Sequence, residues 1–304
     1  MKLTSKAASL PSLRGRIRSI PARRPGAVLS ITLLIFLLFF VSPASAQYGK
    51  IVSLAPLVTE SLYELGIDSE IAGITVYCPK GKYKKEIIGT LLEPDFEKIA
   101  LIKPDLVIST KEGNNKAAVE KLIRLGFNVY VMETSEDFNE ICSNFLSLAK
   151  TVGKENEAKK IVSDSLDAAE DIRKKINVPA AQSVFWEVGA RPLYAAAGKS
   201  FVNSYNHYTK TVNIYADAAA RYLSADAEDV LSRNPDIIIL VNMGDITSGE
   251  IDFWKKYKNI NAVKNNKIFM IDVNDIFTPT PSTFANGVKI LAGIVYPEIF
   301  KGGK

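Results

Sequence analysis

Histidine and cysteine are nearly absent from this sequence. His207 is the only histidine among 304 residues, and Cys78 and Cys142 are the only cysteines. Structural zinc sites need four ligands drawn mostly from these residue types, and disulfide frameworks need at least four cysteines. The sequence therefore excludes multi-histidine metal sites, four-cysteine zinc sites and a disulfide framework, and it disfavours a Ser-His-Asp triad. We expect no resident metal or cofactor.

Acidic residues are missing from the first part of the chain. Residues 1–46 contain seven Lys or Arg and no acid, so the net charge of +5 for the whole chain becomes −2 for the remainder. A nucleic-acid-binding domain usually has a strongly basic surface, and the remainder gives no support for such a partner. The chain is 47% hydrophobic and 23% charged, a globular composition at a length that allows one large domain or two ordinary ones.

Long apolar segments are also missing, apart from a short one near the N-terminus. Residues 27–41 (AVLSITLLIFLLFFV) carry no charge, but a membrane-spanning helix usually needs about 20 apolar residues. Basic residues precede this run and Ala44-Ser45-Ala46 follows it, which is the pattern of a signal peptide. We predict export to a bacterial periplasm, with cleavage before Gln47. An uncleaved anchor helix is the alternative.

After residue 46, short apolar segments alternate with helical ones. Such an alternation is typical of parallel βα units, so the predicted fold class is α/β. Strands are predicted at residues 51–54, 71–76, 106–109, 128–132, 183–188, 236–241 and 267–271. Helices are predicted at residues 57–65, 94–102, 117–125, 138–150, 227–233, 250–258 and 283–294.

The segment between the two sets of strands contains neither glycine nor proline. Residues 155–176 (ENEAKKIVSDSLDAAEDIRKKI) place apolar residues mostly three or four positions apart, which predicts one helix of about six turns. We therefore expect two Rossmann-like lobes with parallel sheets, at residues 47–152 and 178–304. A single long helix within residues 153–177 joins them, and a ligand cleft lies between them.

Two stretches of the chain repeat each other at a constant offset of 131 residues. Residues 95–108 read DFEKIALIKPDLVI, and residues 226–239 read DAEDVLSRNPDIII. The offset aligns Glu97 with Glu228 and one Pro-Asp pair with the other. Each stretch predicts a helix, a turn and a buried strand, so the two lobes are expected to be related.

Four motifs carry a family resemblance. They are residues 51–66 (IVSLAPLVTESLYELG), 73–79 (GITVYCP), 89–108 (GTLLEPDFEKIALIKPDLVI) and 228–239. Together they resemble the helical-backbone periplasmic binding proteins of ABC importers for cobalamin, iron–siderophores or haem, most of all the cobalamin-binding branch. The resemblance implies a non-catalytic monomer that carries a corrinoid, ferric chelate or haem to a permease with ATPase subunits.

Glu97 and Glu228 occupy equivalent positions near the start of a helix in each lobe. The helix dipole also favours an acid in the first turn, which is the structural alternative. In the family that the chain resembles, one surface glutamate per lobe docks into arginine pockets on the permease. The resemblance therefore implies permease docking for Glu97 and Glu228.

Residues after the predicted strands of the first lobe are candidates for the cleft, because ligands of open α/β sheets bind at the carboxyl ends of strands. Tyr77 ends the second strand, and Lys111 and Asn114 follow the third. The resemblance implies ligand contact for Tyr77. Asn114 is also suited to capping the next helix.

In the second lobe, the cleft candidates are mostly aromatic. They are Trp186, Val188, Tyr194, Tyr222 and Phe277. The resemblance puts a cleft aromatic of the cobalamin branch at Tyr222, and a cleft arginine of many relatives at Thr278, beside Phe277. Aromatic rings suit a flat macrocycle, whereas core packing is the alternative.

Two further protein classes share a two-lobed plan. Nitrogenase-like enzymes and metallochaperones need clustered cysteines, and zinc or manganese carriers need several histidines and carboxylates. The two cysteines and single histidine disfavour both classes. Cys78 and Cys142 fit a buried apolar role, with a disulfide as the alternative, and His207 fits a surface position unless the cargo is haem. The sequence leaves the cargo open among corrinoid, ferric chelate and haem.

Overall fold

The computed structural model describes residues 48–242 and 248–300, which belong to one compact unit. The predicted signal peptide at 1–46 and its cleavage site before Gln47 lie outside the described residues. Within the described ranges, no helix combines the length and apolar character needed to cross a membrane. Two β-sheets with surrounding helices make up the described part of the chain.

The first sheet has five parallel strands in the order β3-β2-β1-β4-β5. They are β1 (Ile51–Ser53), β2 (Ile71–Ile74), β3 (Glu86–Ile87), β4 (Leu106–Thr110) and β5 (Val129–Met132). The helices are α2 (Pro56–Glu64), α3 (Phe96–Ile102), α4 (Lys116–Arg124) and α5 (Phe138–Thr151), with a 3₁₀ turn at Asp68–Glu70. Alternate strand residues pack against α2 and α5 on one face and α3 and α4 on the other.

The second sheet has the order β11-β10-β6-β7-β9, with β8 beside β6. Its strands are β6 (Gln182–Ala190), β7 (Leu193–Ala196), β8 (Thr211–Asn213), β9 (Tyr222–Ser224), β10 (Ile237–Asn242) and β11 (Ile268–Asp272). The helices are α7 (Val202–Thr209), α8 (Ala227–Arg233), α9 (Ser248–Lys255), α10 (Asn261–Lys264), α11 (Val273–Ile276), α12 (Pro281–Val295) and α13 (Pro297–Phe300).

The predicted α/β fold class is confirmed, but the second sheet is mixed rather than all parallel. Strands β6, β8, β10 and β11 run parallel, whereas β7 pairs antiparallel with both β6 and β9. The cause is the connection between β6 and β7, since Ala190 pairs with Leu193 across a two-residue turn. Strands joined by so short a turn must run antiparallel.

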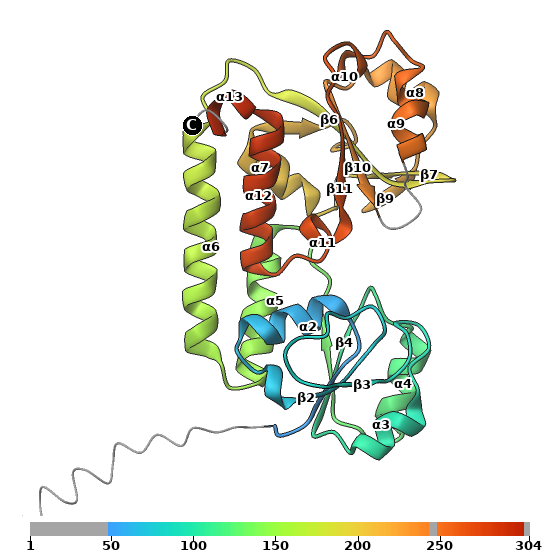
Figure 1. Ribbon diagram of the computed structural model, residues 1–304, viewed down its shortest axis with the longest axis vertical. Helices are drawn as coiled ribbons and strands as arrows, with labels where there is room; N and C mark the ends of the chain where they lie inside the picture. Colours follow the sequence, from blue (N-terminus) through green and yellow to red (C-terminus); the bar gives the residue numbers. More distant parts are fainter. Residues whose placement is uncertain (1–47, 243–247, 301–304) are drawn as a thin grey trace, which may run out of the picture. The chain divides into compact units, whose positions relative to one another are not determined.

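One long helix, α6 (Glu155–Lys175), runs beside α5 and α12 (Figure 1). It matches the helix predicted from the absence of glycine and proline. Its buried residues, including Ala158, Val162, Ala169 and Ile172, face a hydrophobic core that continues from β1 of the first sheet to β10 of the second. The two sheets therefore share one core through the helical layer of α5, α6, α7 and α12.

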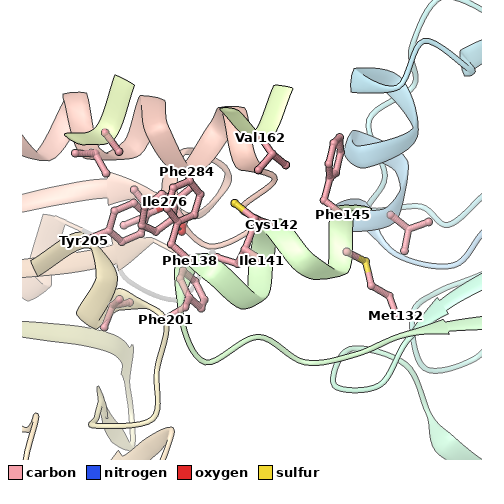
Figure 2. Close-up of a cluster of buried hydrophobic side chains, with 14 of the residues drawn as sticks. Met132, Phe138, Ile141, Cys142, Phe145, Val162, Phe201, Tyr205, Ile276 and Phe284 are labelled. Atoms are coloured by element: carbon pink, nitrogen blue, oxygen red, sulfur yellow. The ribbon is translucent and has the colours of Figure 1, made fainter. Parts of the chain in front are cut away.

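An aromatic stack joins α5, which follows the first sheet, to helices of the second. Phe138 of α5 stacks on Phe284 of α12 with ring centroids 4.0 Å apart, and Phe284 stacks on Tyr205 of α7 at 4.2 Å (Figure 2). The Phe138 amide donates to Ser204 Oγ at 3.0 Å, and the Tyr205 hydroxyl donates to the Ile276 carbonyl at 3.0 Å. This packing makes the junction between the sheets a buried, closely packed surface.

The repeated stretches fold alike. Asp95 and Asp226 are the N-caps of α3 and α8, and each carboxylate accepts a hydrogen bond from a backbone amide of its own helix. Lys103 and Asn234, also 131 residues apart, both end their helices in the left-handed conformation, with φ of 53° and 46°. The same capping at both ends gives α3 and α8 the same seven-residue length.

The aspartates of the two Pro-Asp pairs also have the same role. Asp105 accepts from the backbone amide of Lys50, just before β1, at 2.8 Å. Asp236 accepts from the backbone amide and hydroxyl of Ser183 in β6, both at 2.9 Å. In each sheet, the carboxylate fixes the register between the strand it precedes and the neighbouring strand.

Candidate functional site

A cavity of about 510 Å³ lies between the two sheets. The first sheet lines it with residues that follow β1, β4 and β5, as expected for an open α/β sheet. The second lines it from the start of α7, the start of β9 and the α11–α12 connection. The lining residues are Ala55, Pro56, Leu57, Leu91, Thr110, Glu112, Gly113, Met132, Glu133, Thr134, Ser135, Ile141, Phe201, Arg221, Tyr222, Phe277, Thr278 and Pro279.

Two of the predicted ligand-binding residues, Tyr222 and Phe277, line this cavity. Phe201 also lines it and packs edge-on against Phe277, with ring centroids 5.3 Å apart. Burial and the Glu112 carboxylate raise the pKa of Tyr222, while Arg221 opposes this shift. The phenol is therefore neutral at physiological pH, and the second sheet offers the cavity a set of uncharged aromatic surfaces.

Arg221 is one of the cavity residues that sequence reasoning missed, and it makes polar contacts between the two sheets. Its Nη1 donates to the Ser135 carbonyl at 2.9 Å and lies 3.1 Å from Glu112 Oε2, so the arginine links the second sheet to two loops of the first. Its side chain is only 18% exposed, and that of Glu112 is 48% exposed. The guanidinium has five N–H donors, and the contacts to Ser135 and Glu112 are made by Nη1 alone.

Asn114 supports the cavity wall without lining it. Its Oδ1 accepts from the Thr110 amide at 2.8 Å, and its Nδ2 donates to the Leu54 and Leu91 carbonyls at 2.9 and 3.0 Å. These bonds tie together the loops after β1, β3 and β4. The cap of α4 is the neighbouring Asn115, whose side chain accepts from two helix amides. The capping alternative for Asn114 is thus replaced by a loop-positioning role.

Lys111 lies beside the cavity and pairs with a residue that lines it. Its Nζ is 2.7 Å from Glu133 Oε2, and both side chains are well exposed. The second carboxylate of the cavity is therefore offset by a cation, as Glu112 is offset by Arg221.

The other cleft candidates do not line the cavity. Tyr77 is 63% exposed in the loop after β2, and Tyr194 is 42% exposed on β7. Trp186 is buried in the core, where its indole N–H donates to Asn206 Oδ1 at 3.1 Å, because its side of β6 faces α7. Val188 is half-buried and packs against the same core. For Trp186 and Val188, the core-packing alternative describes the structure.

The two docking candidates occupy matching positions. Glu97 and Glu228 are each the second residue of their helix, α3 or α8, and both are exposed. Within residues 48–242 and 248–300, neither carboxylate lies in an ion pair. Both helices lie on the side of the sheets away from α6 (Figure 1). The two carboxylates are therefore available to a partner.

The cysteines and the histidine lie apart from the cavity lining. Cys78 and Cys142 are free and buried, so the disulfide alternative is not formed. Burial raises the pKa of the Cys142 thiol to about 12. His207 is exposed on α7. In the part of the chain that the structure describes, no group of three or more His, Cys, Asp or Glu side chains is arranged to hold a metal ion.

Comparison with known proteins decides the family. Residues 51–274 match the family described as periplasmic binding protein. This chain belongs to the periplasmic binding protein family. The match spans both sheets and α6, and it confirms the family resemblance of the sequence motifs.

Relatives of the chain are similar over most of its length. A substrate-binding lipoprotein of an ABC transporter from Bacillus subtilis is 28% identical over 260 residues, 83% of this chain and 81% of that protein. A vitamin B12-binding protein from Vibrio parahaemolyticus is 26% identical over 251 residues, 81% of this chain and 90% of that protein.

Solved structures share the fold. The crystal structure of a possible iron-binding (periplasmic solute-binding) protein from Staphylococcus epidermidis has a TM-score of 0.73 and 29% identity, over 82% of this chain and 99% of that one. The two-sheet architecture of this chain is therefore also found in a crystal structure.

Proposed function

We propose that this protein binds a corrinoid in the periplasm and delivers it to the permease of an ABC transporter. The observation that carries the proposal is the lining of the cavity, which combines aromatic walls with a balanced charge. Arg221 offsets Glu112, and Lys111 offsets Glu133. Cobalamin, the corrinoid proposed here, has a flat macrocycle with many amides and one phosphodiester, so it needs apolar area, hydrogen-bonding groups and a single cation.

The vitamin B12-binding relative supports this cargo, since its similarity extends over 90% of that protein. A ferric chelate is the second candidate, because the Staphylococcus epidermidis structure is described as possibly iron-binding. Ferric catecholates carry several negative charges, and a cavity whose two carboxylates already pair with Arg221 and Lys111 suits such a cargo poorly.

Calorimetric titration of the mature protein with cyanocobalamin, haemin and a ferric catecholate tests the cargo. We expect one cyanocobalamin per protein and weaker binding of the other two. Tyr222→Ala is expected to weaken cyanocobalamin binding about tenfold, because an aromatic surface is lost from the cavity. Tyr194→Ala is the matched control, since Tyr194 is similarly exposed at 42% against 36% for Tyr222 but lies outside the cavity.

One result would contradict the proposed cargo, and another would contradict the proposed binding site. One is tighter binding of haemin or the ferric catecholate than of cyanocobalamin. The other is an equal loss of affinity in the Tyr222 and Tyr194 variants, which would move the site away from the cavity. Failure of all three ligands to bind would remove the proposed function as a whole.

The permease is proposed to recognise Glu97 and Glu228. Three observations support these docking roles. The two residues are equivalent in the repeat, both are exposed, and neither forms a competing ion pair among the described residues. Arginine binds such carboxylates through a two-pronged contact. The double variant Glu97→Ala/Glu228→Ala is expected to keep its cargo affinity and to dock more weakly on reconstituted permease. It should also lose much of the salt dependence of docking, because partly exposed ion pairs are screened.

A control for total charge is available in the same two lobes. Glu93 and Asp252 are exposed acids outside the repeated positions, and their double alanine variant changes the net charge equally. We expect docking of this control to stay close to that of the parent. Equal weakening by both double variants, or a loss of cargo affinity in the Glu97/Glu228 variant, would overturn the docking roles.

A further inference from the structure

The loop between β2 and β3 presents lysines and tyrosines to solvent. Within residues 76–85, hereafter the basic loop, Lys80, Lys82 and Lys84 are exposed. The side chains of Tyr77 and Tyr83 are 63% and 55% exposed, and Val76 is exposed beside them. Neither the cavity nor the docking glutamates make use of these residues.

The basic loop is held in a defined conformation. The Tyr63 hydroxyl donates to the Pro79 carbonyl at 2.7 Å, and the Lys82 amide donates to Asp68 Oδ2 at 2.9 Å. Lys85, whose side chain is almost fully buried, forms an ion pair with Asp68 and donates to the Tyr83 carbonyl at 3.2 Å. These contacts therefore hold the backbone of the basic loop in place, while its outer side chains face solvent.

The charge of the outer lysines is not neutralised locally. Asp68 is engaged by Lys85, and Glu86 lies 3.5 Å from Lys98. Among the described residues, Lys80, Lys82 and Lys84 form no ion pair, although Lys82 lies close enough to Asp68 to interact with its charge.

We propose that the basic loop binds the anionic headgroups of a phospholipid bilayer. Lysine clusters are attracted to anionic membrane surfaces, and tyrosine is enriched at the membrane–water interface, where its ring is apolar and its hydroxyl is hydrated. The side chains of the basic loop supply both contributions at one place.

The position of the loop fits this partner. The Lys98 ammonium donates to the Ile87 carbonyl at 3.0 Å, and this bond joins α3 to β3, the strand that follows the basic loop. Lys98 directly follows Glu97 in α3. A protein that docks on a membrane-embedded permease through Glu97 therefore brings a neighbouring basic surface toward the bilayer. The docking of Glu97 on the permease rests on the proposed function, whereas the lipid binding itself requires neither cargo nor permease. A weak contact with the permease and a weak contact with the bilayer strengthen each other when both are made at once.

The chain contains a matched control cluster. Lys255, Lys256 and Lys258 are exposed at the end of α9, around Tyr257. Tyr257 is partly buried and packs against Phe253, with ring centroids 5.5 Å apart. This cluster thus has the same charge as the basic loop but does not display its aromatic ring.

Sedimentation with vesicles tests the proposal. Vesicles of phosphatidylcholine with phosphatidylglycerol should bind the mature protein, vesicles of phosphatidylcholine alone should not, and added salt should release it. Lys80→Gln/Lys82→Gln/Lys84→Gln should weaken binding by about 100-fold, since each lysine near an anionic surface contributes about 1 kcal/mol. The control Lys255→Gln/Lys256→Gln/Lys258→Gln should change it by less than about fivefold.

Three results would overturn the proposal. The first is a failure to bind the anionic vesicles, and the second is an equal loss in both triple variants, which would indicate a general effect of net charge. The third is weaker docking of the basic-loop variant on permease in pure phosphatidylcholine nanodiscs, which would make an acidic permease surface the partner. In each case, cyanocobalamin titration and the Glu97/Glu228 variant still test the proposed function separately.

Discussion

Arg221 is the residue whose replacement tests the cavity most directly. Arg221→Met keeps a long apolar side chain but removes the guanidinium, so the change isolates polar contacts from packing. The variant loses the 2.9 Å hydrogen bond to the Ser135 carbonyl and the 3.1 Å contact with Glu112. Both contacts join loops of the first sheet to the second, so stability and cargo binding are both expected to respond.

The expected effect on stability follows from the exposure of each partner. A hydrogen bond from a charged donor contributes about 1.5–3 kcal/mol, and the Arg221 side chain is mostly buried. The ion pair adds less than about 1 kcal/mol, because the Glu112 side chain is half exposed and its charge is screened by water. Arg221→Met should therefore lower the free energy of unfolding by about 2–3 kcal/mol, and Glu112→Gln by less than about 1 kcal/mol.

The effect of Arg221→Met on cargo affinity should depend on whether the cargo carries a phosphodiester. If the remaining guanidinium N–H groups bind that anion, Arg221→Met should weaken cyanocobalamin binding by about 10–100-fold. Dicyanocobinamide has the corrin ring but lacks the phosphodiester and nucleotide. Its affinity should change by less than about threefold in the same variant, since only the ring contacts remain.

Urea unfolding and calorimetry measure these quantities on the same protein preparations. The Ser135 and Glu112 contacts would be shown unimportant if Arg221→Met were no less stable than Glu112→Gln. An equal loss of affinity for cyanocobalamin and dicyanocobinamide would refute a contact between Arg221 and the phosphodiester. It would indicate instead that the arginine only sets the spacing of the two sheets.

Three further predictions concern the supporting structure. Asn114→Ala should lower the free energy of unfolding by about 3 kcal/mol in urea denaturation, against about 1 kcal/mol for the cap variant Asn115→Ala, and equal effects would exclude the loop-positioning role. Cargo should change the radius of gyration in small-angle scattering only slightly, because α6 is continuous and the stack at Phe138 is rigid, whereas a large decrease would contradict this rigidity. Cys78 and Cys142 should react with a thiol reagent at neutral pH only after unfolding, because both are buried and the pKa of Cys142 is raised to about 12; rapid reaction of the native protein would show that the core opens.

Features that depend on local chemistry were predictable from the sequence. The spacing of apolar residues predicted α6, and the repeated Asp, Glu and Pro-Asp positions predicted two similar helix–strand units. Their caps, Asp95 and Asp226, lie within three residues of the amides that they accept from. Such contacts are encoded within one turn of the chain, so sequence spacing is sufficient to identify them.

Short elements that depend on distant partners were missed. Strands β3, β8 and β9 have only two or three residues each, and no pattern of period two can be recognised over such a length. They are strands because β2, β6 and β7 offer them a paired edge. The mixed second sheet has the same origin, since the direction of β7 is determined by the turn before it.

The residues of the site likewise include some that could be predicted from the sequence and some that depend on contacts between distant parts of the chain. The resemblance placed Tyr222 and Phe277 among the cleft candidates, and both line the cavity. Arg221 escaped notice because its partners, Glu112 and Ser135, belong to the other half of the chain and meet it only when the two sheets share a core. Trp186 was assigned to the cleft because sequence reveals an aromatic residue but not which face of β6 packs against α7. Local patterns in the sequence predict the longer helices and strands and the family resemblance. The side chains that surround the cavity are known only from the folded structure, because a binding site is made by contacts between residues that the chain keeps far apart.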